Sequence, residues 1–316
     1  MTEKNTGIID RDVPVETAIF ELQSYINAIE KNTEIYEERN FDKRIEVIEF
    51  IGFHVIEQVE ELLRKTSQPD KLVLLKYRAE KVKAELEEID NNLFKKLQAN
   101  LTAKKYTGEK FKNLVNEYFD LNSDHAGHPD EPGYDNLDIF INRLFSFQAM
   151  PGQTKDLEPE MVYYQKTPAR IVFELAEKSC LTQEDVFFDL GSGLGQVAIL
   201  INLLAGVTAK GVEFEPAFCA YAENCARELN LSNVTFINAD ARHADYSGGT
   251  IFFMFTPFKG EMLQEVLDIL RKESLLRKIR IITYGPCTAQ VALQSWLHNT
   301  TPEEDNIYRP GIFSSF

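Results

Sequence analysis

The stretch that decides the fold is VFFDLGSGLGQVAIL, residues 186–200. Its apolar beginning predicts a buried strand, and its apolar end predicts a helix. Between them stand Gly191, Gly193 and Gly195, which let the backbone turn tightly and approach a ligand that a Cβ would block. The spacing is GxGxG, because Gln196 stands where the dinucleotide pattern GxGxxG has its third glycine. The turn therefore predicts a ligand site, and its spacing argues against a nicotinamide-dependent oxidoreductase.

The residues around this turn alternate between short apolar strands and helices. Strands are expected at 186–191, 209–214, 234–239, 250–255 and 279–285, with helices in most of the intervals. Continuous apolar strands separated by helices predict a parallel sheet covered on both faces, which is an α/β, doubly wound, Rossmann-like fold. In such a fold the ligand binds at the carboxyl ends of the central strands.

The first part of the chain has a different pattern. From residue 13 to about 122 the apolar residues recur at helical spacing, and the third helix carries a heptad seam at Leu75, Ala79, Val82, Leu86, Ile89 and Leu93. Such helices bury their apolar stripes on one another. We therefore expect an all-α bundle or cap domain over 1–150, followed by the α/β domain over 151–316. The seam favours core packing, and a homodimer through the helical domain is the alternative.

Charge and cysteine usage narrow the class of protein. The net charge of −16 argues against a nucleic-acid partner, because phosphate binding needs a basic surface. No apolar tract is long enough to predict a membrane span, and the first residues do not resemble a signal peptide. The four cysteines lack CxxC spacing and indicate reduced thiols. We therefore expect a cytoplasmic protein.

One segment, SDHAGHPDEPGYDN at residues 123–136, combines His125 and His128 with Asp124 and Asp130. Its glycines and prolines are typical of a linker. No second pair of ligands follows at a fixed helical spacing, so we interpret it as a solvated linker and predict no metal site.

Acidic residues follow three successive predicted strands. Asp189 ends the first strand, Glu213 the second, and Asp240 follows the third. An acid beside the glycine turn is badly placed for a pyrophosphate but well placed for an ammonium or sulfonium group. Glu213 is expected to accept hydrogen bonds from the ribose hydroxyls of an adenosine, and Asp240 from the adenine amino group. Alone, Glu213 is equally well explained as a solvated turn residue. Together, the three acids and the glycine turn predict S-adenosyl-L-methionine as the cofactor.

Residues of about 158–290 resemble class I S-adenosylmethionine-dependent methyltransferases. The stretch DLGSGLGQ is similar, at nearly every residue, to the cofactor loop of the Rossmann-type, non-SET histone-lysine methyltransferases, the disruptor-of-telomeric-silencing family. Upstream, EPEMVYYQKT resembles the loop that in this family folds over the methionine part of the cofactor. With the strand-end acids, the resemblance implies cofactor contacts from Asp189, Gly191, Ser192, Gly193, Gly195, Gln196, Glu213, Asp240, Ala241, Tyr164 and Thr167.

The chain departs from the family at three places. Gln165 and Lys166 stand where the family has Gly-Glu, and Ala241 replaces an aromatic residue. In FTPFKG, after the fourth strand, Thr256 stands where an amide is expected. The basic nucleosome-binding tail and a counterpart of the helical half are missing. The resemblance therefore supports the cofactor more strongly than the acceptor.

The methyl acceptor is expected to enter beside TPFKG, residues 256–260. As catalytic candidates, Phe258 would stack on the acceptor, Thr256 would orient its lone pair, and Tyr164 would belong to a lid. The alternative is that Pro257 and Phe258 simply form a packed turn. Three functions stay open: methyl transfer to a protein amine such as lysine, methyl transfer to a small molecule, and a cofactor-binding module without turnover.

Overall fold

The structure is a computed structural model that describes residues 15–66, 69–121, 132–301 and 306–316. It divides into two compact units, Met1–Leu97 and Gln98–Phe316. This division differs from the boundary expected between residues 150 and 151. The reason is packing within the second unit: α5 (Glu109–Asn116) lies on α8 (Gln196–Ala205), and α6 (Asn136–Leu144) lies on α7 (Ala169–Lys178).

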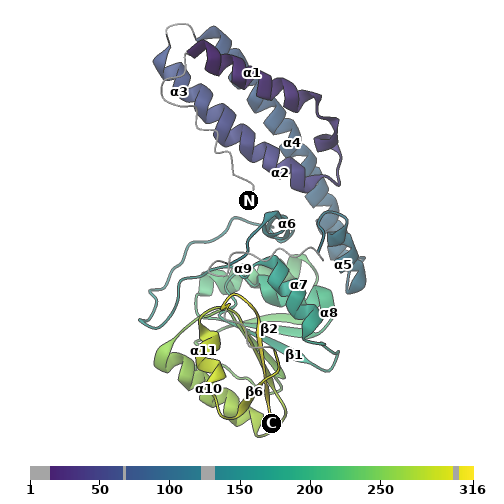
Figure 1. The fold of residues 1–316 in the computed structure, drawn as a ribbon. Helices are drawn as coiled ribbons and strands as arrows, with labels where there is room; N and C mark the ends of the chain where they lie inside the picture. The colour runs from purple at the N-terminus through teal and green to yellow at the C-terminus, as the bar shows by residue number, and fades with distance from the viewer. Residues whose placement is uncertain (1–14, 67–68, 122–131, 302–305) are drawn as a thin grey trace. The chain divides into compact units, whose positions relative to one another are not determined.

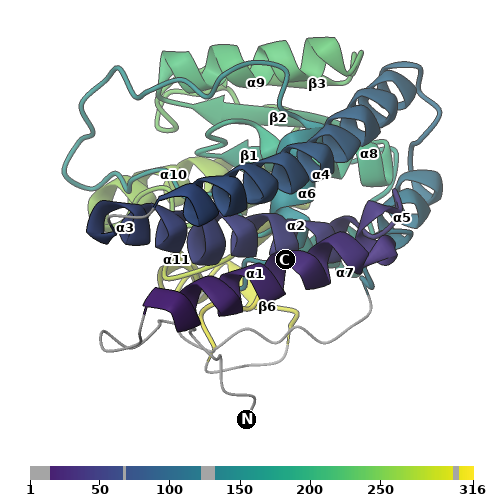
Figure 2. The ribbon, with the colours of Figure 1, turned by 90° about the horizontal axis from the view of Figure 1, so that it is seen from above.

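The first unit is entirely helical. Its elements are α1 (Val15–Lys31), the 3-10 helix η1 (Thr33–Tyr36), α2 (Phe41–Phe50), the π-helical η2 (Ile51–Ile56), α3 (Glu57–Lys65) and most of α4 (Asp70–Thr102). Because α2, η2 and α3 follow without a break, they form one rod that matches the helix predicted over 41–64. This rod lies side by side with α1 and α4 (Figures 1 and 2).

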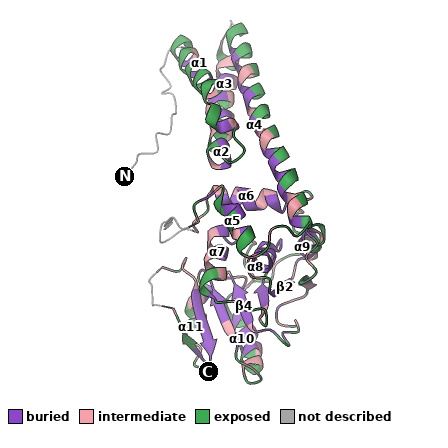
Figure 3. Cartoon of the chain, turned by 90° about the vertical axis from the view of Figure 1, so that its right-hand side faces the viewer, coloured by how far each residue is buried: buried purple, intermediate pink, exposed green. Residues whose placement is uncertain are grey.

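The core of this unit joins α1, the rod formed by α2, η2 and α3, and α4. Leu22 and Ile26 of α1 and Val55 of η2 are buried together with the first part of the predicted heptad seam, namely Leu75, Ala79, Val82 and Leu86. The seam is thus confirmed as core packing over these residues, and the outer faces of the helices are exposed (Figure 3). The homodimer stays a prediction.

A buried ion pair fixes the packing of α2 on α4. Arg44 Nε donates to Asp90 Oδ1 at 2.6 Å, and both side chains are fully buried. The Arg44 guanidinium also donates to the carbonyl oxygens of Ile35, Glu37 and Glu38, which closes the turn after η1. A buried charge is tolerated only with such a full set of partners.

The second unit is built on one seven-stranded sheet of order β3-β2-β1-β4-β5-β7-β6. The strands are β1 (Val186–Leu190), β2 (Thr208–Glu213), β3 (Val234–Asn238), β4 (Ile251–Met254), β5 (Arg280–Thr283), β6 (Leu297–Asn299) and β7 (Gly311–Ser315). The first five are parallel and confirm the predicted strands and the α/β doubly wound class. The sheet is nevertheless mixed, because β7 runs antiparallel to both β5 and β6, which the sequence interpretation did not include.

Helices cover both faces of this sheet, as predicted. Helices α7, α8 and α9 (Pro216–Glu228) lie on one face, and α10 (Gly260–Ser274) and α11 (Cys287–Ala292) lie on the other (Figure 1). The apolar side of α10 packs on β1 and β4 through Leu263, Val266 and Leu267, which contact the buried Phe188 and Phe252 cluster. The helices therefore cover the two faces of the sheet, and the carboxyl ends of the parallel strands are left for a ligand site.

The described residues can be checked for membrane-spanning helices, metal clusters and disulfides. Within the described ranges, no helix is both long and apolar enough to cross a membrane. The same residues contain no cluster of three or more His, Cys, Asp or Glu side chains suited to a metal. The segment with His125 and His128 lies outside the described residues, so the linker interpretation stays a prediction. All four cysteines are free thiols in this structure.

Candidate active site

The glycine turn lies between β1 and α8, and its glycines approach other parts of the same unit. Gly193 has a φ of 52°, and a Cβ on it would overlap the ring of Tyr164. Gly191 has a φ of 75°, and a Cβ on it would overlap Pro257. Gly195, in the turn's last position, packs against Phe236. The glycines therefore allow two segments, one before β1 and one after β4, to close on the turn.

The acids after β1 and β2 lie together beneath this turn. Asp189 is 3% exposed, and its Oδ2 has no hydrogen-bond partner among the described residues. Burial, and secondly the charge of Glu213, raise the pKa of Asp189 to about 8. Glu213 is also buried, which raises its pKa, although its carboxylate accepts from the Gly193 and Glu215 N–H groups at 2.7 Å each.

A buried polar atom without a partner needs a ligand or water in the functional state. Besides Asp189 Oδ2, the Ser192 hydroxyl oxygen of the glycine turn is buried and unpartnered among the described residues. Both residues are among those predicted to contact the cofactor. An adenosyl group with an ammonium-bearing tail supplies hydroxyl and N–H donors of the kind these atoms lack, so the residues present fit the predicted cofactor.

The remaining predicted cofactor residues divide into two groups. Ala241 is buried and lines the cavity described below, next to Ala239. Thr167 and Gln196 are buried beside each other, where Gln196 Nε2 donates to the Thr167 carbonyl oxygen at 3.3 Å, but neither lines the cavity. Asp240 does not line it either, and its carboxylate accepts from Arg242 Nη2 at 2.6 Å. The predicted contact of Asp240 with adenine stays a prediction.

Residues 153–166, which we call the strap, run across the carboxyl ends of the strands. Glu215, at the N-cap of α9, accepts from the Thr154 N–H at 2.8 Å, the Lys155 N–H at 2.7 Å and the Ala217 N–H at 3.0 Å. It also accepts from the Thr154 hydroxyl. Burial by itself would raise the pKa of Glu215, but these bonds lower it to about 2. The first residues of the strap are therefore held at the start of α9 by a carboxylate that stays charged.

The middle of the strap is held at α10 and at the corner after β4. Glu160 accepts from the Met262 N–H at 2.6 Å and the Glu261 N–H at 3.1 Å, which caps the N-terminus of α10. Gly260 makes this approach possible, because a Cβ there would overlap the Glu160 carboxylate. The Val162 N–H donates to the Pro257 carbonyl oxygen at 3.0 Å. Sequence reasoning missed Glu215 and Glu160, since nothing local marks the segment that each one contacts.

The corner after β4 is strained and packed. Thr256 has a φ of 42°, which is a rare conformation for a β-branched residue and typical of functional sites. Its hydroxyl donates to the Tyr284 carbonyl oxygen and accepts from the Cys287 N–H, at 3.2 and 3.1 Å. Phe258 is 3% exposed and is bridged to Met161 of the strap. Both residues line the cavity, but the packed-turn alternative describes Phe258 well, and the Thr256 hydroxyl is already engaged.

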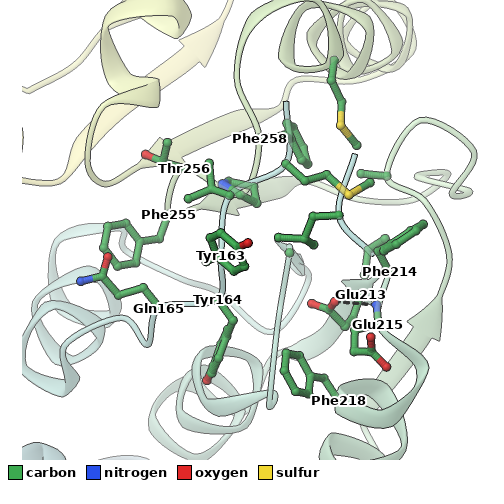
Figure 4. Close-up of a pocket in the computed structure, with 18 of the residues that line it drawn as sticks. Tyr163, Tyr164, Gln165, Glu213, Phe214, Glu215, Phe218, Phe255, Thr256 and Phe258 are labelled. Carbon is green, nitrogen blue, oxygen red and sulfur yellow. Dashed lines mark hydrogen bonds between the residues drawn. The ribbon is translucent and has the colours of Figure 1, made fainter. Parts of the chain in front are cut away.

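These segments enclose a cavity of about 700 Å³, counted with the solvent at its open mouth. The β2 and α9 side contributes Glu213, Glu215 and Phe218, and the β4 side contributes Phe255, Thr256 and Phe258 (Figure 4). Tyr163, Tyr164 and Gln165 of the strap form the wall between them (Figure 4). The cavity therefore has acids at one side and aromatic rings at the other.

The fold and this site resemble those of class I S-adenosylmethionine-dependent methyltransferases. Residues 159–249 match the model of one family, described as histone methylation protein DOT1. This match confirms, over those residues, the resemblance noted in the sequence. It ends before β4, so the corner at Thr256 and Phe258 lies outside it. No curated protein is similar enough to the chain to count as a match.

Three solved structures that share part of the fold are described as methyltransferases. An RNA methyltransferase from Salinibacter ruber, in complex with S-adenosyl-L-homocysteine, is 21% identical, with a TM-score of 0.39, over 48% of this chain and 92% of that chain. A SAM-dependent methyltransferase from Aquifex aeolicus is 16% identical, with a TM-score of 0.36, over 45% and 88%. A precorrin-6y C5,15-methyltransferase from Geobacter metallireducens is 17% identical, with a TM-score of 0.36, over 49% and 92%. The acceptors named there are properties of those proteins.

Proposed function

We propose that the protein transfers a methyl group from S-adenosylmethionine to the nitrogen of a protein amine, such as a lysine side chain. The observation that carries the proposal is the composition of the cavity. Its acidic side at Glu213 suits the adenosyl group, and its aromatic side at Phe255 and Phe258 suits an alkyl chain that ends in a nitrogen. The description of the matched family as a histone methylation protein supports an amine acceptor.

The cofactor supplies an activated methyl group, and the chain supplies alignment. We assign the glycine turn, Asp189 and Glu213 to cofactor binding, and Tyr164 to the cover over Gly193. In the transfer, the lone pair of the acceptor nitrogen forms the new N–C bond while the C–S bond breaks. The electron pair of that bond stays on sulfur, and the methylated ammonium loses its proton to solvent. Alignment of this kind lowers the barrier without any covalent step by the protein.

We assign the Thr256 hydroxyl to holding the strained corner, because it already bonds to Tyr284 and Cys287. That Thr256 orients the acceptor stays a prediction. The backbone carbonyl oxygens of the corner are then the groups left to orient the acceptor nitrogen. The net charge of −16 favours encounter with a basic protein over encounter with an acidic one.

The test is methyl transfer to a cell lysate. The purified full chain is incubated with cofactor labelled in its methyl group, and the lysate is then separated into protein and small-molecule fractions. We expect the label on basic proteins, in acid-stable form on lysine. The Gly193→Val variant, which removes the cofactor site, is the control and should give no label.

The other outcomes contradict the proposal in different ways. Label confined to the small-molecule fraction would identify a small-molecule methyltransferase. If neither fraction is labelled although calorimetry shows binding of S-adenosylhomocysteine, the protein is a cofactor-binding module without turnover.

A further inference from the structure

The last residues of the strap are held by α6 and by the loop just before it. The Tyr134 hydroxyl, in that loop, donates to the Lys166 carbonyl oxygen. The Lys166 ammonium donates to the side-chain oxygen of Asn142 on α6 at 2.6 Å. Tyr164, which covers Gly193, lies only two residues before Lys166. The part of the strap that covers the glycine turn is therefore attached to α6.

Helix α7 begins just after the strap and has no capping side chain of its own. Its N-cap residue is Pro168, which has no side-chain oxygen to accept from the first N–H groups of the helix. Asp138 of α6 supplies the missing acceptor, because its Oδ1 accepts from the Ala169 N–H at 2.8 Å. Its Oδ2 accepts from the Asp135 N–H at 2.9 Å, which caps α6 itself. One carboxylate therefore caps two helices and fixes the place where the strap leads into α7.

The Asp138 carboxyl group is ionisable although it is only 8% exposed. The polar groups around it are Asp135 and Tyr134 in the loop before α6, Lys166 of the strap, and Arg170 of α7, which is bonded to the Asp135 carboxylate. Burial, and secondly the charge of Asp135, raise the pKa of Asp138 to about 6. Its two N–H bonds and the charge of Lys166 act against this rise.

A carboxyl group whose pKa is raised by burial opposes that burial once it is ionised. When residues 166–170 lift from α6, Asp138 meets water and its pKa returns toward the ordinary value of 3.8. The attached form therefore binds the proton more tightly than the lifted form, and lifting releases a proton. The attachment is strongest at low pH and weakens as the pH rises through about 6.

We propose that Asp138 is a positioning residue that holds the end of the strap, and with it Tyr164, and that releases this end more readily as the pH rises. The inference concerns regulation of the site described above, and it rests on the proposed function only in taking Tyr164 as part of the cover over the cofactor. Exchange of the cofactor, which needs the strap to open, should then be faster in a neutral medium than in an acidic one.

The experiment follows hydrogen exchange of residues 166–170 in the ligand-free, full-length chain, corrected for the intrinsic effect of pH on exchange. Between about pH 5 and about pH 7, native protection should fall about tenfold, because Asp138 loses most of its proton over this range. Asp138→Asn should show no such fall, since it has no titrating group at this position. Asp156→Asn is the same change at an exposed position of the strap, and as the matched control it should follow the native profile.

A second variant keeps the test decisive if Asp138→Asn does not fold. Asp135→Asn removes a negative charge beside Asp138 and frees Arg170, and both effects lower the pKa of Asp138. The midpoint of the fall in protection should therefore move to lower pH. A merely structural role for Asp138 would change protection by the same factor at every pH.

Release of S-adenosylhomocysteine connects the attachment to the site. The ratio of the native release rate to that of Asp138→Asn should rise by up to about tenfold over the same pH range, and any effect of Asp189 is common to both proteins. If the thioether does not bind the native chain, the proposed function fails, while exchange in the ligand-free chain still tests Asp138. The proposal is overturned if the native chain and Asp138→Asn lose protection equally with pH, or if native protection rises with pH.

Discussion

Tyr164 lies directly over Gly193, so that no side chain larger than hydrogen fits between the strap and the glycine turn. Gly193 also has a left-handed backbone and donates its N–H to Glu213. One glycine thus connects the strap, the turn after β1 and the acid at the end of β2. A side chain added at position 193 would therefore disturb the strap, the turn and the Glu213 contact together.

The substitution Gly193→Val should abolish binding of S-adenosylhomocysteine. Valine is strained at a φ of 52°, and its branches would push the Tyr164 ring out of place. Isothermal titration calorimetry measures the loss, and circular dichroism checks the fold. Gly152→Ala is the matched control, because nothing lies within 4 Å of a Cβ at Gly152, and its affinity should be native. Unchanged affinity in a folded Gly193→Val protein would contradict our placement of the cofactor.

Glu213→Ala should weaken cofactor binding by about 1–3 kcal/mol, the cost of losing charged hydrogen bonds. The loss has two parts, since Glu213 lines the cavity and also holds the Gly193 and Glu215 N–H groups. Glu223→Gln, an exposed position on α9, serves as the comparison and should bind normally. Equal affinities of the two variants would show that Glu213 is only a turn residue.

Asp189 should make stability fall as the pH rises. Its pKa is about 8 in the folded chain but close to its ordinary value of 3.8 when unfolded, so folding takes up a proton between these values. The stabilisation is complete below the lower value and is lost as the pH rises through the upper one. Urea unfolding over this range should show the slope, and Asp189→Asn should flatten it.

The same carboxyl group should link binding to proton release. Near neutral pH, Asp189 is protonated in the free protein, and a cationic ligand next to it favours the ionised form. Calorimetry in buffers of different ionisation enthalpy should therefore detect protons released on binding. Binding enthalpies that are independent of the buffer would argue against a cation beside Asp189.

Glu215→Gln should loosen the strap without unfolding the unit. The variant keeps one acceptor oxygen but loses the charge that holds Thr154 and Lys155. We expect faster hydrogen exchange of these two amides and faster dissociation of the thioether. In the native protein, the pKa of about 2 implies that this anchor persists to low pH and is lost only as the pH falls toward that value. Native exchange rates in the variant would mean that the other attachments, such as the one at Glu160, hold the strap.

The helical unit offers a test that is independent of the cofactor. Asp90→Leu leaves the Arg44 guanidinium buried without its carboxylate, and it should lower the free energy of unfolding by about 3–5 kcal/mol. Adding Arg44→Met should restore much of that loss, because the unpaired charge is then gone. Denaturant unfolding gives both numbers, with the exposed Glu46→Gln as the reference. A double variant no more stable than Asp90→Leu would show that the pair itself holds α2 on α4.

Local sequence was sufficient for the glycine turn and its acids. Asp189, the glycines and Gln196 are contiguous, and the strand before them and the helix after them are both unmistakably apolar, so the order of elements fixes their place. Glu213 follows in the same way, since it ends the neighbouring strand. The match over 159–249 covers this part of the chain.

Contacts between distant segments were beyond the sequence. Glu160 and Glu215 look like ordinary surface acids, and only the path of the strap gives them their partners. The antiparallel edge was missed because β7 pairs with β5, which precedes it by about thirty residues, and no local pattern marks that pairing. Arg242 is two positions from Asp240, but its side chain also bonds to Glu158, which lies 84 residues earlier in the chain. Local sequence does not indicate that second contact.

A segment fastened at several points along its length behaves differently from a flap hinged at one side. For donor to enter or spent thioether to leave beneath it, charged contacts at Glu215, Arg242 and Glu160 have to give way in concert. Such an opening is slow compared with the motion of a free loop. The rate of repeated turnover would then be limited by release of the thioether and entry of new cofactor. An acceptor that receives several methyl groups would require the strap to open before each further transfer.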